Sequence, residues 1–144
     1  MIQKFVNEIC EILDISTPEI SYDTSNFPTD TMFAQTDSDG KAIYIKKNDK
    51  PEPDLFNSIA HELRHIWQIR TDYELYMSNY KTIEQCESAD QYNIQLAEVD
   101  ANAFAGIIMI DFFQLRPLFD GLSDFVIDKI HQRMDYIAAT ELSG

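Results

Sequence analysis

Residues 55–67 combine the apolar periodicity of an α-helix with two of the three histidines of the chain, His61 and His65. At about 100° per residue, six apolar side chains gather on one side of such a helix: Leu55, Phe56, Ile59, Leu63, Ile66 and Trp67. His61, Glu62 and His65 fall on roughly the opposite side, and the two imidazoles lie one above the other because they are four residues apart. The chain must therefore fold so that the apolar side is covered and the side with the histidines stays accessible.

The spacing of His61, Glu62 and His65 predicts that both imidazoles bind one tetrahedral Zn²⁺ and that the glutamate flanks the ion. The alternative is a chance pair of histidines on a polar helix face. A hydrolytic zinc site needs a third protein ligand and an open position for water. Glu98 is the preferred candidate, because it stands in a segment typical of a buried helix, where a carboxylate is costly unless it binds a metal or a cation. Asp100 is the alternative, although two positions along a helix it points about 200° away.

Asn102 stands one helical turn after Glu98 and therefore on the same face. Its amide oxygen could accept the free ring N–H of a ligating histidine and fix the tautomer of that ring. Small residues on the same helix would let it approach the histidine helix closely: Ala97, Ala101, Ala103, Ala105 and Gly106. A tight helix contact without a metal explains these small residues as well.

The pattern along the chain predicts an α+β fold: an N-terminal helix, a small and mostly antiparallel sheet, the histidine helix, the buried helix of Glu98 and a C-terminal helix. The predicted helices cover residues 2–14, about 53–70, 91–115 and 122–139. Short strands are predicted at residues 20–22, 32–36 and 42–47, with a hairpin turn at 37–40. Residues 48–54 are typical of a loop, in which Pro53 or Asp54 begins the next helix. The polar, tyrosine-rich segment 71–92 has no assignment.

Composition limits the class of protein. The chain has 144 residues, with 11 basic and 25 acidic side chains and a net charge of −14. This length supports one core, so residues 1–144 are predicted to form one domain. The negative charge argues against direct nucleic-acid binding, which needs clustered Lys and Arg. Cys10 and Cys86 cannot form a disulfide framework, and no apolar run approaches the roughly 20 residues that cross a bilayer. A cytoplasmic protein with free thiols and no membrane partner is therefore expected.

The His-Glu-x-x-His motif and the later Glu-x-Asp-Ala-Asn-x-Phe-Ala helix together resemble the glutamate-zincin metallopeptidases. Within that group the chain is similar to the small repressor-cleaving enzymes of phages and mobile elements, and to the minimal single-domain members. The resemblance covers residues 58–70 and 96–109. Arg64 stands where glycine is frequent in the family, and Asn102 stands where thermolysin-like relatives have aspartate.

This resemblance implies a zincin-like fold and a zinc metalloendopeptidase activity. His61, His65 and Glu98 would be the ligands of Zn²⁺, and Glu62 would be the general base and acid. The partners would be peptide or protein substrates, with a basic regulator as one candidate. Zn²⁺ would lower the pKa of a water molecule toward about 7, and Glu62 would take its proton and return one to the leaving amine.

Two further features of the mechanism stay open at the level of sequence. The oxyanion needs a hydrogen-bond donor, for which there are five candidates: His131, Tyr73, Tyr76, Tyr80 and Tyr92. The strand at residues 41–46 could be the sheet edge that pairs with an extended peptide, or an ordinary strand of the sheet.

A different class of function also fits the composition. An acidic protein can bind and mask a basic, DNA-binding partner, with a structural or vestigial metal site. Structural zinc sites favour four protein ligands and cysteine, but Cys10 and Cys86 lie in unrelated segments. An inactive zincin would not need Glu62, which is not required to bind metal. The residues predict neither the substrate nor the oligomeric state.

Overall fold

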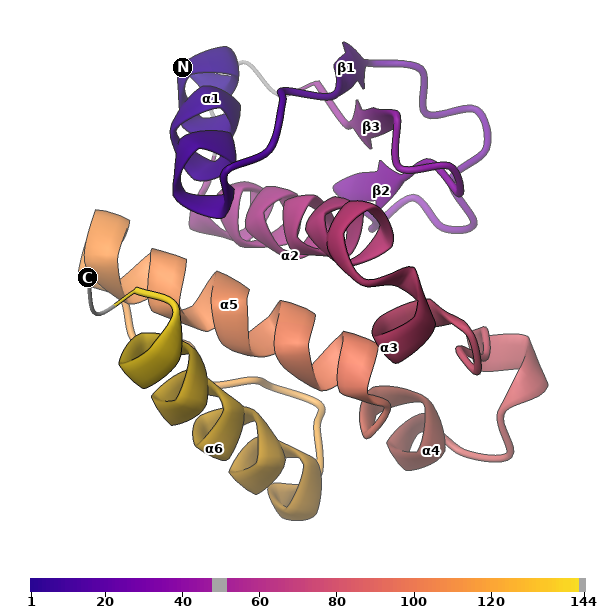
Figure 1. Cartoon of the computed structure of the whole chain (residues 1–144). Coiled ribbons are helices and arrows are strands. Elements are labelled where there is room, and N and C mark those ends of the chain that lie inside the picture. The colour runs from indigo at the N-terminus through magenta and orange to yellow at the C-terminus, as the bar shows by residue number, and fades with distance from the viewer. Residues whose placement is uncertain (48–51, 143–144) are drawn as a thin grey trace.

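The computed structural model describes residues 1–47 and 52–142, which form an α+β fold of six α-helices and one three-stranded sheet. Helix α2 (Pro53–Thr71) lies at the centre (Figure 1). On one side it contacts α1 (Ile2–Leu13) and the sheet, and on the other side it contacts α5 (Leu96–Phe113). Helix α6 (Asp124–Thr140) packs on α5. The shorter elements are β1 (Glu19–Ser21), β2 (Ala34–Thr36), β3 (Ala42–Ile45), α3 (Tyr73–Met77), the 3-10 turn η1 (Ile83–Gln85) and α4 (Ala89–Asn93).

The long helices follow the predicted periodicity, except at the start of α5. This helix begins at Leu96 rather than at residue 91, because Ser88 caps a separate short helix, α4, by accepting a hydrogen bond from the Gln91 N–H at 3.0 Å. Gln95, between the two helices, has an extended ψ of 143°. The unassigned segment 71–92 thus holds α3, η1 and most of α4.

Helix α2 begins as the proline pattern predicts. Pro53 is its first residue, and Glu52 precedes it with an extended backbone. Proline suits this position because its fixed φ is helical and its missing N–H has no partner there. The rest of the loop predicted before the helix, at residues 48–51, lies outside the described residues.

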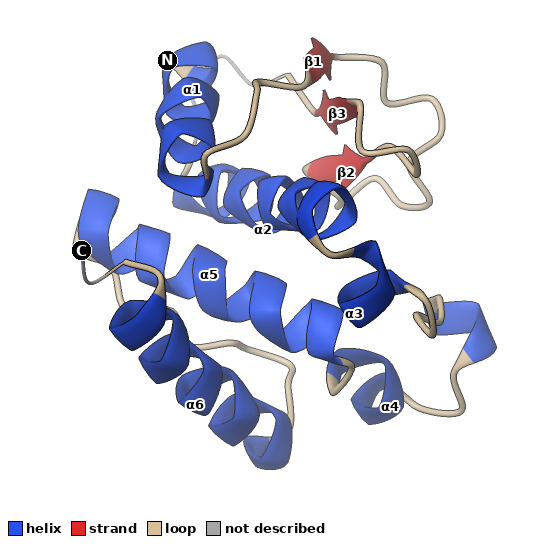
Figure 2. Cartoon of the chain, in the orientation of Figure 1, coloured by secondary structure: helices blue, strands red, loops and turns tan. Residues whose placement is uncertain are grey.

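The sheet is mixed, with one parallel and one antiparallel pair of strands, so the expectation of a mostly antiparallel sheet is correct for only one of the two pairs (Figure 2). The order is β1-β3-β2, with β3 parallel to β1 and antiparallel to β2. The tight turn at residues 37–40 forces β2 and β3 to be antiparallel, whereas the long connection at residues 22–33 lets β1 pair in parallel with the other side of β3. β3 is therefore the central strand, and the hypothesis that residues 41–46 form a sheet edge is wrong.

The hairpin turn between β2 and β3 packs directly on α2. The Asp37 N–H donates to the Ala42 carbonyl and the Gly40 N–H donates to the Asp37 carbonyl, both at 2.9 Å. Gly40 has a φ of +69°, and a Cβ there would lie 3.0 Å from Cγ2 of Ile69. The Gly40 carbonyl accepts a hydrogen bond from Nε of Arg70 at 2.9 Å. Strand β2 is thereby fixed against the histidine helix.

The apolar side of α2 is buried, as its pattern predicts. Five of the six apolar residues are buried and Trp67 is half-buried. Helix α5 is buried along almost its whole length because it lies between α2 and α6. Not all of its small residues serve the contact with α2, since a Cβ on Gly106 would meet Pro117 at 3.2 Å and Met134 at 3.3 Å. Gly106 therefore allows the loop before α6 and α6 itself to approach.

Both cysteines are free thiols, as expected, with Cys10 buried and Cys86 half-buried. Burial raises the pKa of the Cys10 thiol, which keeps it protonated and unreactive. Among the described residues, no helix has the length and the apolar character needed to cross a membrane.

Replacing Gly40 by alanine should lower the free energy of unfolding by more than the same change at Gly121. Both glycines have a positive φ, so each alanine costs about 1–2 kcal/mol of backbone strain. Only at Gly40 does the new methyl group also meet Ile69, whereas no described atom lies within 4 Å of it at Gly121. Denaturant titration of the two variants measures the difference. Equal losses would contradict the close packing of the turn on α2.

Candidate metal centre

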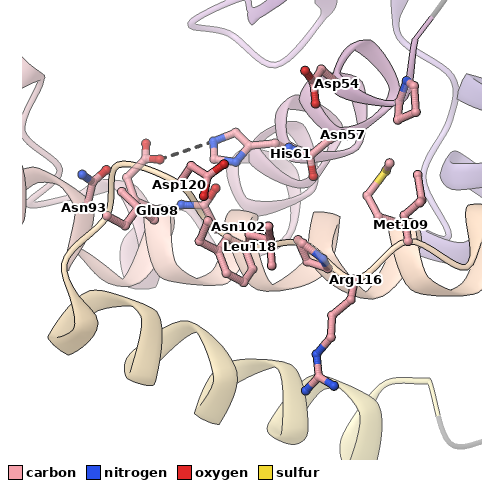
Figure 3. A pocket seen from close by; sticks show the side chains of 15 residues that line it. Asp54, Asn57, His61, Asn93, Glu98, Asn102, Met109, Arg116, Leu118 and Asp120 are labelled. Carbon is pink, nitrogen blue, oxygen red and sulfur yellow. Dashed lines mark ion pairs between the residues drawn. The ribbon is translucent and has the colours of Figure 1, made fainter.

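The three predicted ligands come together at the contact between α2 and α5. His61 and His65 project from adjacent turns of α2, and Glu98 projects from the first turn of α5. The two Nε2 atoms are 3.1 Å apart. The Glu98 carboxylate places Oε2 at 3.3 Å from His61 Nε2 and Oε1 at 3.4 Å from His65 Nε2. Figure 3 shows the carboxylate turned toward the His61 ring.

These distances fit one small metal ion. Ligand atoms placed about 2.0–2.1 Å from a tetrahedral ion are about 3.3–3.4 Å from one another. The two Nε2 atoms are 3.1 Å apart, and each lies 3.3–3.4 Å from a different oxygen of the Glu98 carboxylate. With one ligand atom taken from each residue, the three atoms lie within 4.8 Å of one another, so small side-chain adjustments bring them to the separations of a tetrahedral site. Two imidazole nitrogens and one carboxylate oxygen are donors that Zn²⁺ accepts. These residues could therefore hold a metal ion.

The charges of the cluster are arranged to attract a cation. Burial alone would raise the pKa of Glu98, but hydrogen bonds and charge from His61 and His65 hold it well below its ordinary value. Burial alone would lower the pKa of His65, but the hydrogen bond and the charge of Glu98 raise it to about 9. Without a metal, a proton on His65 thus compensates the carboxylate, and a metal ion would replace that proton.

Two tyrosines among the predicted oxyanion donors bind the same carboxylate. The Tyr80 and Tyr92 hydroxyls donate to Oε1 of Glu98 at 2.6 and 2.9 Å, and they are 2.9 Å from each other. Burial and the charge of Glu98 raise the pKa of both phenols, so both remain protonated donors. Tyr73 lines the cleft beside them.

Two other candidate donors, Tyr76 and His131, do not belong to this cluster. The Tyr76 hydroxyl accepts a hydrogen bond from Arg133 at 3.0 Å. His131 is exposed on α6, with its ring 6.0 Å from that of Phe119. Tyr76 thus contacts α6, and His131 lies on α6 itself, so neither is a candidate donor to the oxyanion at this cluster.

Glu62, the predicted general base, is held by a residue that the motif did not reveal. The Thr36 hydroxyl lies 2.8 Å from Glu62 Oε2 and 3.0 Å from the Glu62 carbonyl oxygen. Thr36 ends β2, the strand that the hairpin turn fixes against α2. Its role depends on strand pairing at long range, so no local pattern in the sequence could indicate it.

Asp100, the alternative ligand, instead binds two arginines on the other side of α5. It is fully buried and accepts hydrogen bonds from Arg64 at 2.7 and 3.0 Å and from Arg133 at 2.9 Å. Burial alone would raise its pKa, but these bonds, chiefly from Arg64, lower it. The helical angle of about 200° between Glu98 and Asp100 explains why only the first reaches the histidines.

Gln68, rather than Asn102, contacts the ring of His65. Its Oε1 lies 2.8 Å from His65 Nδ1. Asn102 lines a cleft near His61 and has no hydrogen bond to His65 among the described residues. The signal for Gln68 was present, because it lies three residues after His65 on the same helix face and is polar beside a buried stripe.

Two clefts meet at the cluster, because both are lined by His61 and Glu98. The first, of about 690 Å³, continues along α2 and α5 toward residues 115–120 of the loop before α6 (Figure 3). The second, of about 470 Å³, continues past Glu62 toward β2, the hairpin turn and the tyrosines. The ligand atoms are therefore reached from two directions.

Comparison of the chain with models of protein families, with curated proteins and with solved structures found no match. A functional assignment therefore depends on the geometry of this centre. Its components are two imidazoles, one carboxylate, a neighbouring glutamate and two tyrosine hydroxyls.

The metal-free protein should lose stability between pH 6.5 and pH 9. The pKa of His65 is raised from 6.5 to about 9, so its contribution is complete below pH 6.5 and disappears as pH rises toward 9. The expected loss is of order 1–3 kcal/mol. Glu98 contributes in the opposite sense, because its lowered pKa makes its stabilisation disappear only in acid.

Denaturant titrations across this pH range, in the presence of a chelator, measure the effect. The control is His65→Gln, which cannot titrate and should show a flatter profile. Equal slopes for wild type and the variant would contradict the coupling between His65 and Glu98.

Proposed function

We propose that the chain is a zinc metalloendopeptidase of the glutamate-zincin type, with a zincin-like fold in which His61, His65 and Glu98 bind Zn²⁺. The observation that supports this most is the convergence of the three ligand groups: the two Nε2 atoms are 3.1 Å apart, and each lies 3.3–3.4 Å from one oxygen of the Glu98 carboxylate. The cluster offers three protein ligands, as hydrolytic zinc sites do, whereas structural sites use four.

When bound, Zn²⁺ acts as a Lewis acid that acidifies water and polarises a peptide carbonyl. Glu62 is placed to act as the base, since it follows His61 and its Oε2 is held by the Thr36 hydroxyl. It accepts a proton from the attacking water while the oxygen of that water forms a bond to the carbonyl carbon. The same carboxyl group then gives the proton to the amide nitrogen as the carbon–nitrogen bond breaks.

Tyr80 and Tyr92 are the hydroxyl donors best placed to stabilise the oxyanion. Both stand against Glu98, a ligand of the proposed ion, and both remain protonated. The negative charge that develops on the substrate oxygen competes with the Glu98 carboxylate for these donors. The two hydroxyl oxygens are only 2.9 Å apart. One hydroxyl can therefore stay hydrogen-bonded to Glu98 while the other donates to the substrate oxygen.

The arrangement of the clefts favours cleavage within a chain rather than at its end. Because both clefts are lined by His61 and Glu98, a polypeptide can extend on both sides of the bond that is cut. β2 is an edge strand and borders the second cleft through Gln35 and Thr36. An extended substrate can therefore pair with β2, which replaces β3 as the proposed docking strand.

The net charge of −14 favours a basic polypeptide as substrate. The same charge would favour a protein that masks a basic regulator, so binding alone does not distinguish these functions. Cleavage does distinguish them, because only the peptidase breaks a covalent bond.

The variant Glu62→Gln should bind one zinc ion per chain and lose peptidase activity by a factor of about 10²–10⁴, since it removes the base but no ligand. The matched variant Glu98→Ala should lose both the zinc and the activity. Elemental analysis of dialysed protein measures the metal, and mass spectrometry of a peptide mixture measures cleavage. Peptidase activity of Glu62→Gln equal to that of wild type would remove Glu62 from the mechanism.

Capture of substrates on zinc-loaded Glu62→Gln adds the test against a masking protein. Captured proteins should acquire new termini when zinc-loaded wild type is added, and a chelator should prevent this. Captured proteins that stay intact and are released by moderate salt would instead support the masking function.

A further inference from the structure

Gln68 lies between the proposed metal centre and the buried ion pair of Arg64 and Asp100. It is fully buried on α2. Its Nε2 donates to Oδ2 of Asp100 at 2.8 Å and to the carbonyl oxygen of Ala97 at 3.0 Å. Both partners are acceptors only, because Asp100 is an ionised carboxylate and the other is a backbone carbonyl. The two amide hydrogens of Gln68 are therefore both used, and the orientation of the amide is determined.

The orientation of this amide determines the tautomer of His65. With Nε2 directed at Asp100 and Ala97, Oε1 faces Nδ1 of His65 at 2.8 Å. An amide oxygen can only accept, so Nδ1 must carry the hydrogen and donate it. The lone pair of the neutral ring then lies on Nε2, the atom that faces His61 and Glu98.

Asp100 cannot turn away to release Gln68, because four donors surround it. Oδ2 accepts from Arg64 Nε at 2.7 Å as well as from Gln68. Oδ1 accepts from Arg64 Nη2 at 3.0 Å and from Arg133 Nε at 2.9 Å. The same Nη2 of Arg64 also donates to Glu141, just after the end of α6. Three helices thus fix the position of one carboxylate.

We propose that Gln68 is a positioning residue that sets the tautomer of His65 and thereby couples the Arg64–Asp100 ion pair to the binding of zinc. This inference rests on the proposed function, since it concerns the affinity of the same centre for its metal. The chain of contacts is continuous: Asp100 fixes the amide of Gln68, the amide fixes the Nδ1 hydrogen of His65, and Nε2 is left free for the ion.

The variant Gln68→Met tests the coupling, because methionine has a similar shape and neither donates nor accepts strongly. Loss of a hydrogen-bond partner to a ligating histidine typically weakens metal binding about 10–100-fold, and that loss is expected here. The matched control is Tyr76→Phe, which removes the 3.0 Å hydrogen bond on the far side of the same network without touching His65. Zinc affinity is measured by competition with a chromophoric chelator, and denaturant titration measures the stability of each metal-free protein.

The proposal is supported if the affinity for zinc, relative to wild type, falls 10-fold or more in Gln68→Met and changes less than twofold in Tyr76→Phe. Equal losses in both variants, or a change below twofold in Gln68→Met, would overturn it, because a merely structural role would lower stability without a selective effect on affinity. If wild type itself binds no zinc, the proposed function fails, and this outcome is distinct from the other two.

The wild-type protein gives a second test that does not require a variant to fold. In zinc-loaded, ¹⁵N-labelled protein, ring correlation spectra show which nitrogen of each histidine carries hydrogen, with exposed His131 as the internal reference. His65 should carry hydrogen on Nδ1, with slow exchange of that hydrogen. Hydrogen on Nε2 of His65, or a metal bond through Nδ1, would contradict the role of Gln68.

Discussion

The ion pair between Arg64 of α2 and Asp100 of α5 is the interaction on which the rest of the structure depends. Arg64 is 1% exposed and Asp100 is fully buried, and two hydrogen bonds of 2.7 and 3.0 Å join them. Removing one partner of such a pair leaves an uncompensated buried charge, which typically costs about 3–5 kcal/mol. Arg64 also stacks on the ring of Trp67, 3.7 Å from its centroid. The pair joins the turn of α2 between the two histidines to the turn of α5 that carries Glu98, so it helps to fix the distance across the candidate metal centre.

Helix α5 uses two acidic residues in opposite ways. Glu98 and Asp100 are both buried and ionised, yet they face different sides of the helix because they are two positions apart. Asp100 is neutralised permanently by Arg64 and Arg133. Glu98 is compensated only by imidazoles and tyrosine hydroxyls, and these can exchange a proton for a metal ion. The Asp100 carboxylate therefore stabilises the fold, whereas the Glu98 carboxylate is available for chemistry.

The sequence pattern predicted those features that are determined by the periodicity within a single helix. The apolar stripe of α2 correctly set His61 and His65 on the opposite side of the helix, and the cost of a carboxylate in an apolar helix indicated Glu98. The expectation that this side stays accessible was wrong for His65, which is 8% exposed because α5 packs there. Contacts between distant segments left no such pattern, which is why the central position of β3 and the contact of Thr36 with Glu62 were not predicted. Asn102 was chosen as the partner of a histidine because it shares a face with Glu98, but Gln68, on the histidine helix itself, reaches His65. The angular position of a residue around its helix does not tell whether Asn102 or Gln68 lies nearer to the His65 ring.

Diffraction from crystals of the zinc-loaded protein, measured above and below the zinc absorption edge, tests the central claim most directly because it locates the ion itself. The account predicts one anomalous peak about 2.0–2.2 Å from Nε2 of His61, Nε2 of His65 and an oxygen of Glu98, with no fourth protein ligand. The two Nε2 atoms should remain close to their present separation of 3.1 Å. A peak away from these three residues, or a fourth protein side chain closing the site, would contradict the assignment of a hydrolytic zinc centre.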